Sequence, residues 1–297
     1  MSRDTISTAV VLGLALAFCF GTSDYLSKGL TEKVGFYRTT IYTLASSGAL
    51  VFLPLLIPGA PSMPTVSGVA VLALISVSTF LAFLSMYRGY QRGHLSVVSP
   101  IVNSFPIFSV VFAVFVLKID LSYEVLLALG GVIFGILLVS TNLSALGSSG
   151  GRSLTPGVPE AIFAAFFFAV GFTALGYAEE NVGYLLPVLA ARLGAASVGL
   201  LAGLALKQDL KPFGGKPLRR LLAMGTLEAA GLLAFTAALY YSSGIAVLPI
   251  TTTLAGMGVV FTVGYALVLL KEKVELNYAA GILILIASVA ALLYFTA

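Results

Sequence analysis

The fold is decided by the stretch Ala238–Gly281, which reads ALYYSSGIAVLPITTTLAGMGVVFTVGYALVLLKEKVELNYAAG. In it, an apolar segment ends at Tyr240–Tyr241, and a short Ser-Ser-Gly turn leads into a second long apolar segment that carries Pro249. The charged tripeptide Lys271–Lys273 separates this segment from a third one. Long apolar segments joined by short polar turns are typical of helices that cross a membrane.

The same order of features occurs earlier in the chain, which indicates an internal repeat. Pro100–Ile101 precedes Pro249–Ile250 by 149 positions, and Val110–Phe112 precedes Val259–Phe261 by the same number. Two matches at one offset favour a duplicated unit of about half the chain, so the two copies are expected to pack against each other.

The composition predicts an integral membrane protein. Hydrophobic residues make up 59% of the chain and charged residues only 9%, against about 25% charged residues in soluble domains. Ten apolar segments are long enough to cross about 30 Å of hydrocarbon as α-helices. They are predicted at 6–27, 37–57, 66–87, 96–117, 122–141, 158–178, 184–206, 220–242, 246–270 and 277–296.

The basic residues are distributed unevenly among the predicted loops. Thirteen Lys and Arg residues lie in or beside the loops that follow odd-numbered segments, whereas Arg3 and Lys118 lie on the opposite side. The positive-inside rule therefore predicts that these loops face the cytoplasm and that both termini lie outside. The thirteen are Lys28, Lys33, Arg38, Arg88, Arg92, Arg152, Lys207, Lys211, Lys216, Arg219, Arg220, Lys271 and Lys273.

Each copy has an odd number of segments, so the second copy must cross the membrane in the opposite direction to the first. The sequence thus predicts an all-α integral membrane protein with ten transmembrane helices in two inverted five-helix repeats. We expect the N-terminal repeat at 1–146, a Gly- and Ser-rich linker at 147–157 and the C-terminal repeat at 158–297. Such folds hold a substrate near mid-membrane, between halves that rock against each other.

Two pairs of glycines, each four residues apart, allow close contact between helices. Gly131 and Gly135 lie on the fifth predicted helix, and Gly199 and Gly203 on the seventh. These pairs mark either packing within one chain or the contact of a homodimer.

Two charged residues lie about two turns or more inside predicted membrane helices, where each costs roughly 2.5–3.5 kcal/mol on insertion scales. Glu228 lies about two turns into the eighth segment, and Arg192 about two turns into the seventh, counted from the opposite face. Three interpretations are open. The two side chains neutralise each other and join their helices; or one or both face a cavity, where Glu228 takes up a proton or a cationic substrate group; or Arg192 extends to the membrane surface.

Asp24 lies near the end of the first segment, one helical turn before Lys28. One interpretation is an ion pair between Asp24 and Lys28 at the membrane surface. The other is that Asp24 faces a cavity and gates its cytoplasmic mouth.

Polar residues follow the helix prolines Pro100 and Pro249 at matching places in the two copies, with Asn103 in the first and Thr252 in the second. They either satisfy carbonyl groups near the prolines or line a central site.

Two tyrosines and three helix-breaking residues complete the candidate set. Tyr90 and Tyr241, near the ends of the third and eighth segments, either line the central site or serve only in packing. We expect Pro100, Pro249 and Gly21 to act as hinges or gates.

The sequence lacks the motifs of soluble catalysis. Its single His is in a predicted loop, and it contains no paired metal-ligand spacing, phosphate-binding loop or nucleophile elbow. We therefore expect no enzymatic activity, no metal or other cofactor and no nucleic-acid partner; an ATP-driven pump and an intramembrane hydrolase are disfavoured.

Over essentially its full length the chain resembles the EamA-type transporters of the drug/metabolite transporter superfamily. This resemblance implies ten helices in two inverted five-helix repeats, a central cavity built mainly from helices other than the fifth and tenth, and export of amino acids or other small metabolites. Two features depart from the family pattern: Phe20–Gly21 stands where Trp-Gly is usual, and the acidic residue expected after the fourth segment is shifted to Asp120. The features that carry the resemblance are Phe20–Asp24, Arg38, Tyr90–Pro100, and Leu270–Lys273 before Gly281.

The preferred hypothesis is a secondary transporter, an exporter of small metabolites such as amino acids, that works by alternating access in the cytoplasmic (inner) membrane of a prokaryote. One alternative is a non-transporting membrane scaffold or sensor that binds partner helices, which predicts a dry, apolar interior. The other is a flippase for a lipid-linked group, which needs a lateral opening. The residues expected to bind substrate or couple transport are Glu228, Arg192, Asp24, Asn103, Thr252, Tyr90 and Tyr241.

Overall fold

The computed structural model describes residues 3–52, 66–140, 156–182, 185–241 and 247–271, and positions 280–281, 283–284, 287–288 and 291. Most of the predicted linker 147–157 and most of the predicted tenth segment 277–296 lie outside the described residues. All regular secondary structure in the described residues is helical. In chain order the helices are α1 (Arg3–Val34), α2 (Phe36–Phe52), α3 (Val66–Arg92), α4 (Leu95–Val102), α5 (Phe105–Phe115), α6 (Tyr123–Ser140), α8 (Val158–Val182), α9 (Leu185–Leu189), η2 (Ala190–Gly194), α10 (Ala195–Ala205), α11 (Lys216–Tyr241), α12 (Leu248–Gly256) and α13 (Gly258–Val268).

Seven spans in the described part of the chain are long and apolar enough to cross a membrane. The shorter α2 has 17 residues, and α6 has an apolar part at Tyr123–Gly135. These helices confirm the prediction of an all-helical, multi-pass membrane protein, whereas the count of ten remains a prediction. The seven spans are Thr8–Val34, Gly68–Arg92, Leu95–Phe115, Val158–Glu179, Leu185–Ala205, Lys216–Tyr241 and Leu248–Val268.

The first of two long helix pairs consists of α1 and α11. The Phe20 ring lies against Gly231, and the Arg220 side chain lies against Gly29. The contacting positions rise along α1 as they fall along α11, so the two helices are antiparallel. Because Gly231 has no side chain, the Phe20 ring can lie directly on the α11 backbone.

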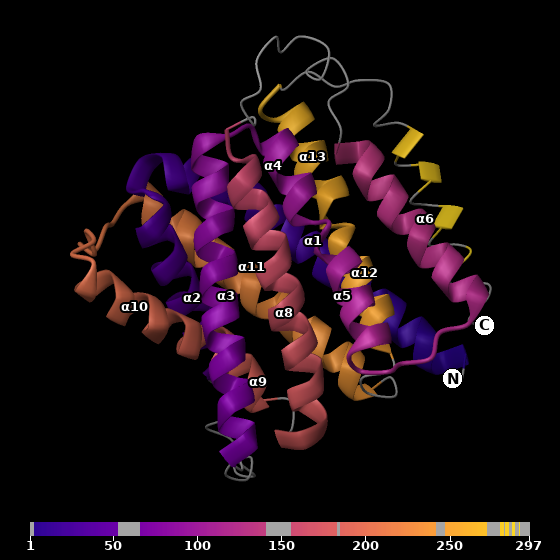
Figure 1. Ribbon diagram of the computed structural model, residues 1–297. Helices are drawn as coiled ribbons and strands as arrows, with labels where there is room; N and C mark the ends of the chain where they lie inside the picture. The colour runs from indigo at the N-terminus through magenta and orange to yellow at the C-terminus, as the bar shows by residue number, and fades with distance from the viewer. Residues whose placement is uncertain are drawn as a thin grey trace.

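The second long pair consists of α3 and α8, which run side by side in Figure 1. Gly89 lies near Glu160, and Gly171 lies near Ser78, so this pair is antiparallel as well. Helix α13 instead runs parallel to α1, since its Gly258 carbonyl group lies against Gly21 and the centre of its Tyr265 ring lies 5.2 Å from that of the Tyr25 ring, further along both helices.

Two of the membrane spans are broken in the middle. Helix α4 ends before Asn103–Ser104, and α5 begins directly afterwards with Pro106 in its first turn; Pro100 lies inside α4. Helices α12 and α13 meet at Met257. Pro249 lies in the first turn of α12, where its missing N–H breaks no helical hydrogen bond, and its role as a hinge remains a prediction.

The seventh predicted segment is one span with a wide turn inside it. Helix α9 passes into the π-helical turn η2, which carries Arg192, and then into α10. Such π turns are rare and frequently lie at functional sites.

The glycine pair of α10 is used within the chain. Gly199 lies against Phe80 of α3 and Ile41 of α2, and Gly203 lies against Tyr37 of α2. The Tyr37 hydroxyl donates a hydrogen bond to the Gly199 carbonyl oxygen at 2.8 Å. This pair therefore supports the interpretation of packing within one chain, while a homodimer contact remains a prediction.

Basic side chains gather at the end of the bundle where α1, α3 and α10 finish and α2, α8 and α11 begin, here called the basic end. The Lys28 ammonium group on α1 donates to the carbonyl oxygens of Tyr90 and Gly93, at 2.7 and 2.9 Å, where α3 finishes. Arg92 of α3 pairs with Glu160 at the start of α8. The basic residues of these helix ends and of the loop between α10 and α11 are Lys28, Lys33, Arg38, Arg88, Arg92, Lys207, Lys211, Lys216, Arg219 and Arg220.

Candidate functional site

A cavity with about 610 Å³ of empty space lies between α1, α3, the break of α4 and α5, α8, η2 and α11. Its walls combine aromatic rings with buried polar groups, which differs from the dry, apolar interior expected of a scaffold. The aromatic residues are Phe20, Phe83, Phe105, Phe168 and Phe172, and the polar ones are Asp24, Thr79, Asn103, Arg192 and Glu228.

The charged residues Arg192 and Glu228 meet in the cavity wall. The Arg192 Nη2 atom lies 3.0 Å from Glu228 Oε2, and it also donates to the Glu228 backbone oxygen at 3.1 Å. Both side chains are buried. The structure thus brings together the two charges that the sequence placed at similar depth. Arg192 does not extend to the membrane surface, so this interpretation is wrong.

The surroundings of this pair hold Arg192 in place. Its guanidinium carbon lies 5.1 Å from the centre of the Phe83 ring, a distance at which a cation is attracted to the ring face. Its Nε atom is buried and has no hydrogen-bond partner among the described residues. The Nε–H of Arg192 is therefore available as a donor, while the charge of Arg192 is balanced by Glu228.

Asp24 lies in the same cavity and is 6% exposed. The Asn103 side-chain amide donates to Asp24 Oδ2 at 3.4 Å, and the Thr262 hydroxyl lies 3.5 Å from the same oxygen. The predicted surface ion pair with Lys28 is wrong, because the Lys28 ammonium group lies 3.2 Å from Glu32 and donates to the end of α3. Asp24 therefore contacts neutral donors at long distance.

The family model for EamA-like transporters matches residues 7–141. These residues, somewhat under half of the chain, match the EamA-like transporter family. The resemblance seen in the sequence is thereby confirmed.

Two relatives and one solved structure are also similar to this chain. An "Uncharacterized transporter" of Archaeoglobus fulgidus is 23% identical over 96% of this chain and 97% of its own length. An uncharacterized protein of Methanocaldococcus jannaschii is 25% identical over 46% of this chain but 98% of its own length. A structure titled "Crystal structure of protein" has a TM-score of 0.72 at 15% identity and covers 98% of each chain, so it shares the fold.

Five predicted residues lie at or beside the cavity. Asp24, Asn103, Arg192 and Glu228 line it directly. Tyr90 is fully buried next to Asp24, although its hydroxyl group makes no hydrogen bond to the described residues. Its role in substrate binding remains a prediction.

Thr252 and Tyr241 lie elsewhere. The Thr252 hydroxyl donates to the Leu248 carbonyl oxygen at 2.7 Å inside α12, so it satisfies the backbone and does not line the cavity. Tyr241 is 70% exposed at the end of α11. It follows Glu228 by thirteen residues, which at 3.6 residues per turn places it about 220° around the helix, on the opposite face.

Several cavity residues were missed from the sequence. Phe168 and Phe172 of α8 line the cavity, and the cluster Phe166–Phe168 was an available signal. No sequence pattern marked Thr262 of α13 as a site residue. It lies more than two hundred residues from Asp24 in the chain and approaches it only in the folded protein.

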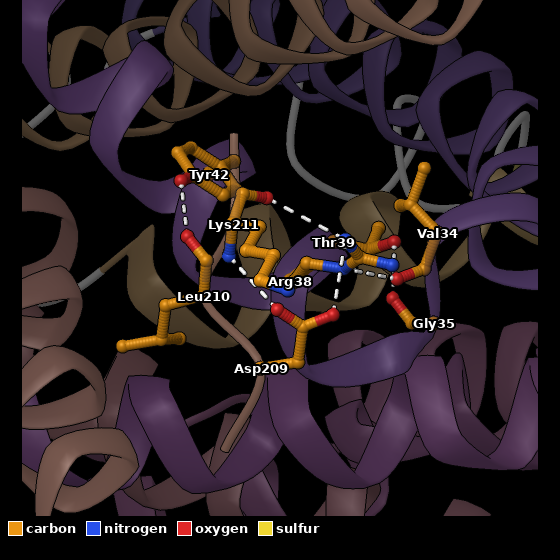
Figure 2. Close-up of polar contacts among 8 residues, drawn as sticks. All are labelled: Val34, Gly35, Arg38, Thr39, Tyr42, Asp209, Leu210 and Lys211. Atoms are coloured by element: carbon orange, nitrogen blue, oxygen red, sulfur yellow. Dashed lines mark hydrogen bonds and ion pairs between the residues drawn. The ribbon is translucent and has the colours of Figure 1, made fainter. Parts of the chain in front are cut away.

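At the basic end, α2 is joined to the loop between α10 and α11 by a set of contacts here called the basic-end clamp (Figure 2). Arg38 Nη1 lies 3.4 Å from Asp209 Oδ2 and 3.5 Å from the Lys211 carbonyl oxygen. The Tyr42 hydroxyl donates to the Leu210 carbonyl oxygen at 2.8 Å. The clamp joins a helix of the N-terminal half to a loop of the C-terminal half, close to solvent.

Proposed function

We propose that this EamA-like protein is a secondary transporter that carries a small amphipathic metabolite, such as an amino acid, and exports it by alternating access. The observation that carries this proposal is the cavity, in which phenyl rings and buried charged groups face the same space. The EamA-like match of residues 7–141 and the relative named as a transporter support a membrane transporter.

The packing of the helices supports the proposal of two inverted five-helix repeats. The first copy would begin with α1 and the second with α8. Lys28 of α1 donates to the carbonyl oxygens that end α3, so α1 and α3 both finish at the basic end. Because α8 is antiparallel to α3, α1 and α8 run in opposite directions, as inverted copies require.

Equivalent helices of the two copies also make equivalent contacts with the other copy, as such a repeat predicts. The first helix of each copy packs along the third helix of the other, α1 on α11 and α8 on α3. Each first helix also contacts the broken fourth span of the other copy, α1 on α12 and α13, and α8 on α4 and α5. The half-length relative of Methanocaldococcus jannaschii fits a unit of one copy.

We propose that the basic end faces the cytoplasm of a prokaryotic cell and that the termini lie outside. The uneven charge distribution supports this orientation by the positive-inside rule. To load substrate from the cytoplasm, the two halves would separate at the basic end, and the basic-end clamp would then open. The clamp contacts are few and partly exposed, which suits a contact that breaks and re-forms in each cycle.

The proposal is tested with purified protein in lipid vesicles that are preloaded with individual labelled amino acids. We expect counterflow or efflux of at least one of them. Thr79→Phe should abolish this flux, because it fills the cavity. Thr226→Phe, on an exposed face of α11, is the matched control and should retain flux. Full activity of Thr79→Phe would contradict the proposal, and no flux of any compound would favour the scaffold alternative.

A further inference from the structure

The charged groups that line the cavity do not balance. Glu228 and Arg192 form an ion pair with each other, which leaves the Asp24 carboxylate without a cation among the described residues that line the cavity. Lys28, one turn along α1, is already paired with Glu32. With Asp24, Glu228 and Arg192 all ionised, the lining of the cavity therefore carries one net negative charge.

An isolated buried carboxylate is costly, and the neighbours of Asp24 reduce this cost only in part. Asn103 and Thr262 are neutral donors at 3.4 and 3.5 Å, longer than a typical hydrogen bond. The Tyr90 hydroxyl, buried beside Asp24, has no partner that meets normal geometry. A buried charge is compensated by a proton or by a bound cation, and the cavity beside Asp24 has room for the second.

We propose that the transported molecule is a monovalent organic cation with an aromatic or similarly bulky apolar body, and that its cationic group binds beside Asp24. This inference rests on the transporter function proposed above and narrows its small amphipathic metabolite to an organic cation, in place of a zwitterionic amino acid. A protonated amine or a quaternary ammonium group would neutralise the cavity. A zwitterionic amino acid of the same shape would leave its net negative charge unchanged.

The apolar walls suit the body of such a molecule. Phe105 stacks on Phe172 with ring centres 5.1 Å apart, and Phe172 also contacts Phe168 and Phe20. These rings give a continuous aromatic surface in the same cavity as the polar groups. Aromatic faces attract organic cations, and the attraction grows when water is excluded.

Arg192 selects against anions rather than for them. Its charge is balanced by Glu228, so the carboxylate of a ligand would have to compete with that ion pair. The unpaired Arg192 Nε–H can instead donate to a neutral oxygen of a ligand. A neutral acceptor on the substrate is therefore compatible with the site. A carboxylate on the substrate would instead be repelled by Asp24 and Glu228.

The decisive experiment compares tryptamine, a monocation, with tryptophan, its zwitterionic counterpart. The protein contains no Trp, so the fluorescence of the bound indole can be measured without a protein indole signal. Binding is titrated at neutral pH in detergent, and exchange of the same two compounds is followed in vesicles. We expect tryptamine to bind at least about tenfold more tightly than tryptophan, a difference of about 1.4 kcal/mol.

Variants of Asp24 show whether this preference comes from its charge. Asp24→Asn should remove most of the preference for tryptamine, whereas Asp24→Glu, which keeps the charge, should retain a preference. Glu124→Gln, at an exposed position of α6, is the matched control and should bind like the parent protein. Gel filtration and circular dichroism confirm that each variant is folded.

Each outcome decides between the two proposals. Equal or tighter binding of tryptophan, or an unchanged preference in Asp24→Asn, would overturn the cation assignment. If tryptophan is exchanged and tryptamine is not, transport stands and the cation assignment fails. If neither indole binds, the assignment also fails, and the amino-acid flux assay then decides separately whether the protein is a transporter.

Discussion

Two Arg–carboxylate pairs of the molecule differ in their surroundings, one within the C-terminal half and one between the two halves. The pair Arg192–Glu228 lies at the cavity, is 3.0 Å long, and has side chains that are 2% and 3% exposed. The pair Arg38–Asp209 lies at the basic end, is 3.4 Å long, and has side chains that are 24% and 57% exposed. The chemistry of the two pairs is the same, so the difference in their roles comes from solvent.

Water can replace the partners of the exposed pair but not those of the buried one. Breaking a buried pair leaves a charge without compensation and costs several kcal/mol, whereas an exposed pair contributes about 0–1 kcal/mol. We infer that Arg192–Glu228 stays intact during transport and that Arg38–Asp209 opens and closes. A rocking motion needs this combination of a fixed centre and weak contacts at the ends.

The largest effect is expected from removing one partner of the central pair. Arg192→Met leaves Glu228 buried without a cation and should lower the free energy of unfolding by about 3–5 kcal/mol. The double variant Arg192→Met with Glu228→Met should recover most of this loss, because no charge remains unpaired. The measurement is unfolding by denaturing detergent in mixed micelles.

The exposed Arg219 at the start of α11 provides the matched control. Arg219→Met should change the unfolding free energy by less than about 0.5 kcal/mol. If Arg192→Met were as stable as Arg219→Met, the central pair would not stabilise the packing of η2 on α11, and the contrast between the two ion pairs would lose its basis.

A second prediction asks whether the fixed centre extends to the contact of α1 with α13. A methyl group at Gly21 would collide with the carbonyl oxygen of Gly258, which is backbone and cannot rotate away. Gly21→Ala should therefore cost about 1–3 kcal/mol of unfolding free energy. Because Asp24 lies one turn further along α1, the variant should also weaken ligand binding.

Gly130 of α6 is the control for this substitution, since a methyl group there meets no described atom within 4 Å. Gly130→Ala should leave unfolding and ligand binding close to those of the parent protein. A Gly21→Ala protein with unchanged stability and binding would mean that α1 and α13 can separate at little cost.

Much of the helical architecture could be predicted from the sequence because each span is decided locally. The segments predicted at 184–206 and 246–270 correspond to Leu185–Ala205 and Leu248–Val268. The meeting of Arg192 and Glu228 was also predictable as one alternative, since the rise per residue fixes the depth of each side chain in the membrane. Depth along a helix follows from counting residues.

The environment of the site was harder to predict, because it depends on which helices become neighbours. The partners of Asp24 are Asn103 and Thr262, which come from two other helices, and local spacing favoured Lys28 instead. Tyr241 was misplaced because only its closeness to the end of α11 was considered, not its angle around the helix. Facing directions and long-range neighbours need the assembled bundle.

The smallest effect on stability, with the clearest effect on transport, is expected at the basic-end clamp. Asp209→Asn removes the ion pair with Arg38 and should lower the unfolding free energy by no more than about 1 kcal/mol. It should nevertheless change the rate of substrate exchange and reduce the dependence of that rate on salt, because exposed charges are screened by ions. The measurement is exchange in vesicles over a range of ionic strength.

Asp120→Asn is the matched control, since the exposed Asp120 lies in the loop between α5 and α6 and makes no ion pair with a described residue. It should leave both the rate and its salt dependence unchanged. If Asp209→Asn behaved in the same way as Asp120→Asn, opening of the clamp would not limit transport, and the weak contacts that govern the rocking motion would have to lie elsewhere. The next candidate would then be Arg88 and Arg92 with Glu160, which join α3 to α8 at the same end through partly exposed arginines.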